Sequence, residues 1–352
     1  MKIEDMKIAV MVGTLRTPLD EGTGKSAVNL AKELDKQVDE AFIFTRDSNH
    51  KEDNLSKEES YQGIRIVRRS ITPAGFFQNR DLMKEEDVDL VHVHTSSAKM
   101  ALYTSKLASS SLWTIPAYRS SRFEEKLWKL FSRQRALATS KDLKESSPGE
   151  NVVPYGIDTE NYNIRRTPDR DNMNILYMGA PNEKRGFFSA IQIVKHLSES
   201  EDVTFHVAVR ERDNQKERAE EIIEEEGLSD ITTVRGFIDD LPEFYNRIDV
   251  LLNPIKDASG VTSPPVITLE AMSCGRIVCC TDIPDFTNLI DDESGLLFEY
   301  GEERALAERI SKLSDRDMNN ISANAREKIE SEYSWDYITE TYLNIYEEII
   351  NG

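Results

Sequence analysis

The sequence has few cysteines and no long apolar run, and each absence excludes a class of protein. Only three cysteines occur among 352 residues, Cys274, Cys279 and Cys280. The last two are adjacent, which suits neither a disulfide framework nor a CxxC metal clamp. No apolar stretch approaches the roughly 18 residues that a membrane-spanning helix needs, and residues 1–5 lack the apolar segment of a signal peptide. We therefore expect a cytoplasmic protein.

Positive charge is also scarce. The formal net charge is −20, which argues against non-specific binding to nucleic acid and gives no broad basic face for acidic lipids. An anionic substrate would have to be bound by a local group of cations or by backbone amides that overcome the overall field. The search for a site therefore concentrates on such groups.

The apolar residues, 39% of the chain, follow an alternation of strands and amphipathic helices that is typical of βαβ units. The predicted strands are 7–13, 41–45, 64–69, 88–94, 111–115, 135–139, 174–179, 203–209, 231–235, 249–253 and 277–281. The predicted helices are 24–36, 78–86, 96–108, 121–134, 186–199, 213–226, 239–247, 264–274, 303–314, 317–331 and 335–350. The polar segment 46–62 is predicted to be an exposed loop.

This alternation predicts an α/β protein of two Rossmann-like domains that face each other across a cleft. The first domain is predicted to span 1–165, with the apolar stripe of helix 335–352 packing back on it. The second domain is predicted to span 170–332. Ligands of such sheets bind at the carboxyl ends of the strands. The residues at these ends are Gly13, His94, Gly179, Arg210, Gly236, Asn253 and Asp282.

The segment Gly22-Thr23-Gly24-Lys25-Ser26 resembles the end of a Walker A loop, but Leu19 stands where that motif needs its first glycine. A P-loop ATPase is therefore a minor alternative. Glycines at a helix N-terminus can still hold a phosphate or sugar through free amides. A plain turn into the following helix explains Gly22, Thr23 and Gly24 about as well.

Two other features in the first half have competing interpretations. His92 and His94 share one face of a strand, but without an acidic or cysteine partner they do not predict a metal site. His94 ends its strand, which leaves a role in the cleft open. The basic amphipathic stretch 119–135 could lie on an anionic membrane surface, although packing against the core is the more common role of such a helix.

The strongest signal is the stretch 249–275, DVLLNPIKDASGVTSPPVITLEAMSCG. Its strand ends at Asn253, Ser263 is predicted to cap the next helix, and the two prolines that follow suit the first helical positions. Free amides near Val266 and Ile267 could bind a pyrophosphate. Glu270 falls one turn later on the face of Val266, where its carboxylate could accept both hydroxyls of a ribose.

The block LEAMSCG with IVCCTDIPDFTNLIDDESGLLF resembles the donor site of the retaining glycosyltransferases of family four, glycosyl transferases group 1. The segments GTGKSAVNLAKEL, DVDLVHVH, NVVPYGIDTENYN, YMGAPNEKRGF and VRGFIDDLPEFYNRIDVLLNP match in order, so the resemblance covers nearly the whole chain. It implies the two-domain architecture called GT-B. The implied activity is hexosyl transfer from a UDP-, GDP- or dTDP-sugar to an acceptor hydroxyl, in the synthesis of a glycan, glycolipid or cell-surface polysaccharide.

The resemblance assigns roles to several residues of the second half. Glu270 is expected to bind the donor ribose, and Lys184 and Arg185 to neutralise the diphosphate. Gly236 and Phe237 are expected to meet the nucleobase through their backbone. Gly179, Thr262, Ser263, Val266 and Ile267 complete the expected donor site, and Gly22, Thr23, Gly24 and His94 the acceptor or phosphate side.

Two positions depart from the family pattern. Ala180 stands where an arginine usually follows the strand-ending glycine, and Thr262 stands where the first of two paired glutamates is usual. A catalytically impaired binding or scaffold protein is therefore the alternative. For an active enzyme, the resemblance implies front-face attack with retention of configuration, no metal and no cofactor. The acceptor is expected to be a sugar or a lipid-linked sugar, with peripheral contact at the inner membrane face left open.

Overall fold

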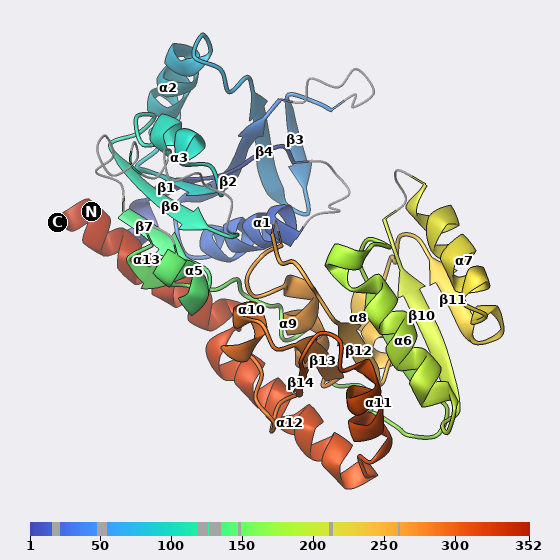
Figure 1. Ribbon diagram of the computed structural model, residues 1–352. Coiled ribbons are helices and arrows are strands. Elements are labelled where there is room, and N and C mark those ends of the chain that lie inside the picture. The colour runs from blue at the N-terminus through green and yellow to red at the C-terminus, as the bar shows by residue number, and fades with distance from the viewer. Residues whose placement is uncertain are drawn as a thin grey trace. The chain divides into compact units, whose positions relative to one another are not determined.

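The structure is a computed structural model that describes residues 1–15, 22–47, 55–117, 126, 135–146, 149–210, 214–259 and 261–352 (Figure 1). The chain forms two compact units. The first comprises Met1–Gly156, Ser259–Ser263 and Trp335–Gly352, and the second comprises Ile157–Ala258 and Pro264–Ser334. Each unit has its own sheet and core, so each is considered by itself.

The sheet of the first unit has the strand order β3-β4-β2-β1-β5-β6-β7-β8, and β3 is antiparallel to β4 while the other pairs are parallel. Its strands are β1 (Lys7–Val12), β2 (Glu40–Arg46), β3 (Glu58–Tyr61), β4 (Ile64–Arg69), β5 (Leu90–His94), β6 (Ser110–Ile115), β7 (Arg135–Ala138) and β8 (Asn151–Val152). The chain order reverses between β1 and β5, which is the topological switch point of this sheet.

Helices cover both faces of this sheet (Figure 1). They are η1 (Ile3–Asp5), α1 (Gly22–Asp35), α2 (Phe76–Glu85), α3 (Ala98–Thr104), α5 (Lys141–Ser146) and α13 (Trp335–Asn351). Alternate residues of β1 enter different cores, since Val10 packs with α1 and α13 while Met11 packs with α2 and α3. The contacts of α13 with α1 and β6 confirm that the C-terminal helix packs back on the first domain.

The second unit has an all-parallel sheet of strand order β11-β10-β9-β12-β13-β14. Its strands are β9 (Met173–Met178), β10 (Val203–Ala208), β11 (Thr232–Arg235), β12 (Val250–Asn253), β13 (Ile277–Thr281) and β14 (Leu296–Phe298). Numbered within the unit, this is the order 3-2-1-4-5-6 of Rossmann folds, and its switch point lies between β9 and β12. The predicted fold class is therefore confirmed.

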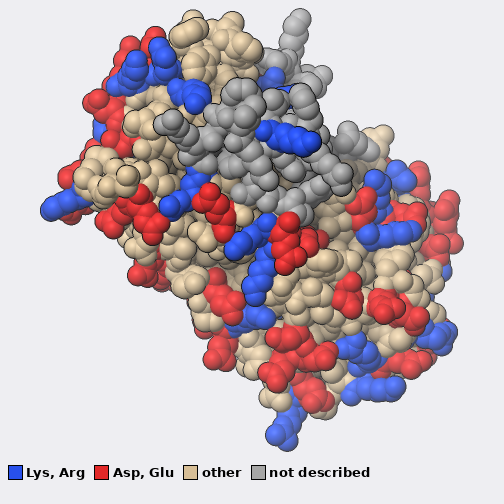
Figure 2. Space-filling model, turned by 60° about the vertical axis from the view of Figure 1, so that its left-hand side comes forward, with Lys and Arg blue, Asp and Glu red and all other residues tan. Residues whose placement is uncertain are grey.

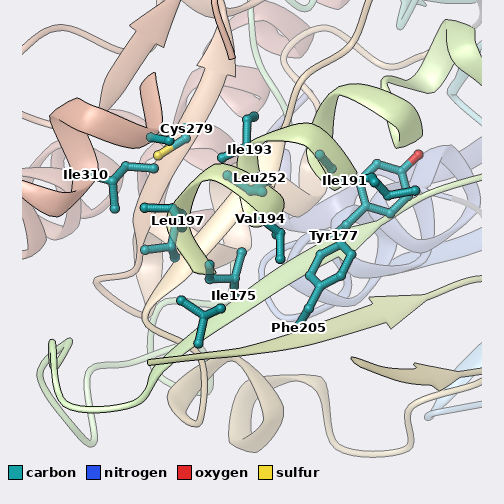
Figure 3. Packing of buried hydrophobic residues seen from close by; sticks show 14 of the residues in the cluster. Ile175, Tyr177, Ile191, Ile193, Val194, Leu197, Phe205, Leu252, Cys279 and Ile310 are labelled. Carbon is teal, nitrogen blue, oxygen red and sulfur yellow. The ribbon is translucent and has the colours of Figure 1, made fainter. Parts of the chain in front are cut away.

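The core of the second unit lies between the sheet and helices that follow its strands. The helices are η2 (Glu183–Arg185), α6 (Phe187–Ser198), α7 (Gln215–Glu225), η3 (Ser229–Ile231), α8 (Leu241–Asn246), α9 (Val266–Ser273), α10 (Pro284–Thr287), α11 (Glu303–Ser311) and α12 (Asp315–Glu332). Figure 3 shows Ile191 and Leu197 of α6 in one packed cluster with Ile175, Phe205 and Leu252 of the sheet. The hydroxyl of Tyr177 points away from the other labelled side chains.

Several elements differ from the predictions. Strand β3 lies within the segment 46–62, so the prediction of a loop there is wrong for Glu58–Tyr61. Its side chains are half-buried or exposed, and its carboxylates pair with arginines of β4, so its sequence EESY lacks the apolar pattern of a strand. The short elements β8, β14, α5 and α10 were not predicted. The helix predicted over 121–134 lies outside the described residues, apart from Lys126.

Candidate functional site

The switch point of the second unit lies between the loop after β9 and the loop after β12. Parallel strands carry their following loops at one edge of a sheet, and ligands of such sheets bind outside that edge at the switch point. The loop after β9 contains Lys184 and Arg185, and the loop after β12 leads into α9. The sequence predicted phosphate-binding groups in both of these loops.

The loop after β9 is held in shape by partly buried polar contacts. The Tyr177 hydroxyl donates to the carbonyl oxygens of Ala180 at 2.7 Å and Arg185 at 3.3 Å, so one side chain holds both ends of the loop. The side chain of Asn182 accepts from the Arg185 N–H at 3.1 Å. These contacts fix the backbone that carries the two cations.

The loops after β9 and β12 are in direct contact. Gly186 has φ +78°, and a Cβ atom built there would lie 1.7 Å from the Pro254 carbonyl oxygen. The N–H groups of Lys256 and Asp257 both donate to the Lys184 carbonyl oxygen at 3.0 Å. Only glycine permits this close approach, which places the cations beside the segment leading to α9.

Lys184 and Arg185 share one partner, Asp257. The Lys184 Nζ lies 3.3 Å from Asp257 Oδ2 and its side chain is 75% exposed, so it can reach a ligand. Arg185 Nη1 donates to the Asp257 carbonyl oxygen at 3.0 Å. Burial and the nearby charge of Arg210 lower the pKa of Arg185, partly offset by Tyr177 and Asp257. The site is thus positively charged at its exposed edge.

Helix α9 begins two residues later than predicted. Its N-cap is Pro265 with extended backbone, and Ser263 does not cap it, so that prediction is wrong. Pro264 precedes another proline, which disfavours helical backbone there. Within the part of the chain that the structure describes, the N–H groups of Val266 and Ile267 have no hydrogen-bond partner. They are free to donate to an anion at the positive helix end.

Glu270 is buried in α9 and is 3% exposed. Its Oε2 accepts a hydrogen bond from the Tyr245 hydroxyl at 3.1 Å, and Tyr162 also hydrogen-bonds its side chain. Burial and the Glu270 charge raise the pKa of both tyrosines, so both stay protonated donors. A carboxylate has about four acceptor positions, and the two tyrosine hydroxyls occupy two of those of Glu270.

Gly179, Gly236 and Phe237 lie at the same carboxyl edge of the sheet. The Gly179 N–H donates to the Ala208 carbonyl oxygen at 3.0 Å, which continues the pairing of β9 with β10. Gly236 and Phe237 follow β11, the outermost strand, and the Phe237 ring is 56% exposed. An exposed ring at this edge is free to contact a flat ligand.

Thr262 and Ser263 belong to the first unit, although they come late in the chain. Ser263 donates through its N–H to the Pro116 carbonyl oxygen at 3.0 Å, and its side chain lies 3.0 Å from the Ser140 hydroxyl. These contacts hold Ser263 at the ends of β6 and β7. The roles of Thr262 and Ser263 at the donor stay predictions.

The residues predicted on the acceptor or phosphate side flank the switch point of the first unit. Helix α1 begins at Gly22, so Gly22, Thr23 and Gly24 form its first turn instead of a loop before it. His94 ends β5, is 1% exposed and stacks on Tyr155 with 5.8 Å between ring centroids. Burial lowers the pKa of His94 to about 3, so its imidazole is neutral.

Three tyrosines and an asparagine of the site were not predicted. They support the site through hydrogen bonds, and the sequence pattern predicts only core or loop at their positions: Tyr162, Tyr177, Asn182 and Tyr245. Tyr177 and Tyr245 are fully buried, and an aromatic residue at such a position usually indicates packing. Tyr177 lies near the end of β9 and Tyr245 in the helix before β12, and neither position indicates a binding role from the sequence alone.

Residues 172–316 match the family model described as Glycosyl transferases group 1. The second unit therefore contains a glycosyl transferases group 1 domain. WcaL of Escherichia coli (strain K12), provisionally named as a glycosyltransferase of colanic acid biosynthesis, is 28% identical over 174 residues. The alignment covers 47% of this chain and 43% of WcaL, so the chain matches less than half of that relative's length.

Solved structures extend the fold comparison beyond the group 1 domain. A glycosyltransferase from Rickettsia africae ESF-5 has a TM-score of 0.77 at 17% identity and covers 99% of both chains. Anabaena HepE in complex with UDP has a TM-score of 0.78 at 15% identity, covering 97% of this chain and 100% of HepE. The two-unit chain therefore has the GT-B fold. None of the helices that the structure describes is both long and apolar enough to cross a bilayer.

Proposed function

We propose that this protein is a retaining glycosyltransferase that moves a hexosyl group from a nucleotide diphosphate sugar to an acceptor hydroxyl. The observation that carries the proposal is the switch point of the second unit, where Lys184 and Arg185 lie beside the segment leading to α9. Cations and free helix amides are the groups that bind a diphosphate. HepE was solved with UDP and with UDP-glucose, which supports a nucleotide-sugar donor for this fold.

In the proposed reaction, the bond between the sugar C1 and the donor diphosphate breaks while a bond forms from C1 to the acceptor oxygen on the same face. The acceptor proton passes to the leaving diphosphate. Lys184, Arg185 and the amides of α9 stabilise the negative charge that develops on that group, so the scheme uses no metal ion and no cofactor. Glu270 accepts hydrogen bonds from the ribose, and Gly236 and Phe237 meet the base.

The acceptor is proposed to bind the first unit, near Gly22, Thr23, Gly24 and His94. We propose that the protein takes part in the synthesis of a polysaccharide or a related glycan. The name of the similar protein WcaL, which refers to colanic acid biosynthesis, supports this role. We propose that the reaction takes place in the cytoplasm or at the inner face of the membrane. On the visible face of the molecule, acidic and basic side chains are interspersed (Figure 2).

A thermal-shift screen with UDP-, GDP- and dTDP-sugars tests the proposal, because a bound donor stabilises the folded state in proportion to its affinity. We expect the sugars of one nucleotide to raise the melting temperature of the protein. This rise should be smaller in Glu270→Ala and in Lys184→Ala. Glu217→Ala, on the exposed side of α7, is the control. Since Lys184 is exposed, its variant stays informative even where Glu270→Ala fails to fold. An unchanged melting temperature with every donor would contradict the proposal.

Retention is tested by the anomeric configuration of the product. Once an accepted donor and acceptor are found, the proton coupling constant at C1 in the NMR spectrum distinguishes α from β linkage. We expect the configuration of the donor to be kept. An inverted product would leave glycosyl transfer intact and contradict front-face attack.

Ala180 and Thr262 favour a second candidate, a catalytically impaired protein that binds nucleotide and serves as a partner for another transferase. Both residues lack the charge that the family pattern has at these positions. Donor binding without hydrolysis or transfer to any acceptor would favour this candidate. Turnover that increases in Thr262→Glu would show instead that the site is active and tuned by that position.

A further inference from the structure

The register of β9 and β10 places a third cation at the carboxyl edge of the second sheet. Met178 is paired with Ala208, and the Gly179 N–H donates to the Ala208 carbonyl oxygen at 3.0 Å. Arg210 comes two residues after Ala208, so its backbone lies at the carboxyl edge of the sheet that also carries Gly179 and Ala180. The Val209 N–H donates to the Arg235 carbonyl oxygen at 2.9 Å, so the backbone stays extended up to this point.

Arg210 is exposed, and its charge acts on Arg185. Burial is the main cause of the lowered pKa of Arg185, and the positive charge of Arg210 is a smaller one, which agrees with the strand register that puts both residues at this edge. Lys184 adjoins Arg185 and carries a further positive charge. Repulsion between like charges raises the free energy of the empty site, and a bound anion with several negative charges relieves it.

The neighbouring residue Ala180 offers only a methyl group to a ligand. Its carbonyl oxygen is held by the Tyr177 hydroxyl, so the backbone beside Arg210 is fixed. A guanidinium presents several N–H donors in a planar fork that matches phosphate oxygens. A long side chain reaching from the adjacent strand end can therefore supply the contact that Ala180 cannot.

We propose that Arg210 is a third diphosphate-binding cation of the donor site and takes the place left by Ala180. The inference rests on the proposed function, because it adds a residue to the same site. Arg210 contacts the diphosphate itself, together with Lys184 and Arg185. A nucleoside diphosphate should therefore depend on Arg210 more strongly than the corresponding monophosphate does.

Isothermal titration calorimetry of the full chain tests this inference, with UDP, GDP and dTDP and their monophosphates as probes. We expect Arg210→Ala to weaken binding of the preferred diphosphate about tenfold and to change monophosphate affinity much less. Arg218→Ala, an exposed residue of α7, removes the same charge elsewhere and should leave both affinities unchanged. Ala180→Arg in the Arg210→Ala background should restore most of the lost affinity. Circular dichroism checks that each variant is folded.

The outcomes separate this inference from the proposed function. If the wild type binds a diphosphate and Lys184→Ala weakens binding while Arg210→Ala does not, the role of Arg210 is contradicted and the donor site stands. Equal loss of monophosphate and diphosphate affinity in Arg210→Ala would also contradict it. If no diphosphate binds the wild type, the proposed function itself fails.

Discussion

The hydroxyl of Tyr245 donates a hydrogen bond of 3.1 Å to Oε2 of Glu270, in a place almost closed to solvent. The same hydroxyl lies 3.4 Å from the Ile267 carbonyl oxygen, in the first turn of α9. Tyr245 therefore fixes the Glu270 carboxylate against the start of the helix that bears it. A buried carboxylate needs such donors, because burial without them is costly.

We expect Tyr245→Phe to weaken binding of the preferred nucleotide sugar about fivefold, which corresponds to about 1 kcal/mol for one lost hydrogen bond. The reason is that Glu270 loses the contact that orients it, while the ring and its packing remain. Calorimetric titration of the donor measures this effect. Direct contact with the ribose is assigned to Glu270, so Tyr245 is a positioning residue.

Tyr346→Phe is the matched control for this prediction. Its hydroxyl is likewise buried and lies 2.7 Å from His92 Nδ1, but in the first unit. Both variants should lower the free energy of unfolding by about 1 kcal/mol, and only Tyr245→Phe should change donor affinity. Equal donor affinities in the two variants would exclude a positioning role for Tyr245.

The fold could be predicted from the sequence because most strands are continuous apolar runs followed by amphipathic helices. Strand β9 and helix α6 are examples, since β9 has a run of consecutive buried residues and the buried residues of α6 recur with the period of a helix. Strand β3 could not be predicted in this way. Its stability depends on pairing with β4 and on ion pairs such as that of Glu58 with Arg69, which are partners set by the fold.

The candidate site could be predicted only where one short segment carries the signal. Lys184, Arg185 and the start of α9 each lie in or at the end of the loop that follows a strand, so their common edge follows from the βαβ pattern. The contact of Tyr245 with Glu270 spans 25 positions and depends on how α8 and α9 pack. The prediction that Ser263 caps α9 is wrong because Pro265 disfavours helical backbone at Pro264, so the helix starts later. The general preference for serine at helix starts does not include this local effect.

Stability of the first unit should depend on pH through His94. Burial lowers its pKa to about 3 in the folded state, against about 6.5 when unfolded. Stability is therefore complete above pH 6.5 and is lost as the pH falls toward 3, since only the unfolded state binds the proton. At pH 5.5 the loss from His94 alone should be about 1.4 kcal/mol relative to pH 7.5, and the buried His92, whose pKa is also lowered, adds to it.

Urea unfolding at pH 7.5 and 5.5 measures this loss through tryptophan fluorescence. Every tryptophan of the chain falls within the residue ranges of the first unit, so the signal reports on that unit. His94→Leu removes the titrating group and should make the difference between the two pH values smaller by about 1.4 kcal/mol. An unchanged difference in His94→Leu would show that His94 binds its proton equally in the folded and unfolded states.

The buried carboxylate of Asp249 should be important for the stability of the second unit. It is 0% exposed and accepts from Arg166 at 2.5 Å, from the Asp169 N–H at 2.9 Å and from the Asn174 N–H at 2.8 Å. Asp249→Ala leaves these donors unpaired and should cost about 3 kcal/mol or more. Hydrogen–deuterium exchange of β9 and β12 measures the loss.

Glu243→Ala provides the comparison for Asp249, because its ion pair with Arg165 is 3.1 Å long but about two-fifths exposed. Solvent screens such a pair, so we expect a cost below about 1 kcal/mol. Similar exchange rates in the two variants would indicate that burial of Asp249 adds little to its contacts.

Gly186→Ala should destabilise the loop after β9, which carries Lys184 and Arg185, by more than the positive φ angle of this position alone explains. The position has φ +78°, which costs an L-residue about 1 kcal/mol. In addition, the new Cβ would lie 1.7 Å from the Pro254 carbonyl oxygen, so the loops after β9 and β12 would have to separate. Because Lys184 and Arg185 lie in one of these loops, nucleotide binding should fall together with stability.

Gly227→Ala isolates the backbone contribution to that effect. Gly227 has φ +71°, close to that of Gly186, and a Cβ atom there would meet nothing within 4 Å. Its variant should lose about 1 kcal/mol of unfolding free energy and keep full nucleotide affinity. Gly186→Ala should lose clearly more stability and bind the nucleotide at least tenfold more weakly, as measured by urea unfolding and calorimetry. If the two variants behaved alike, close contact between the two loops would not be what places the cations.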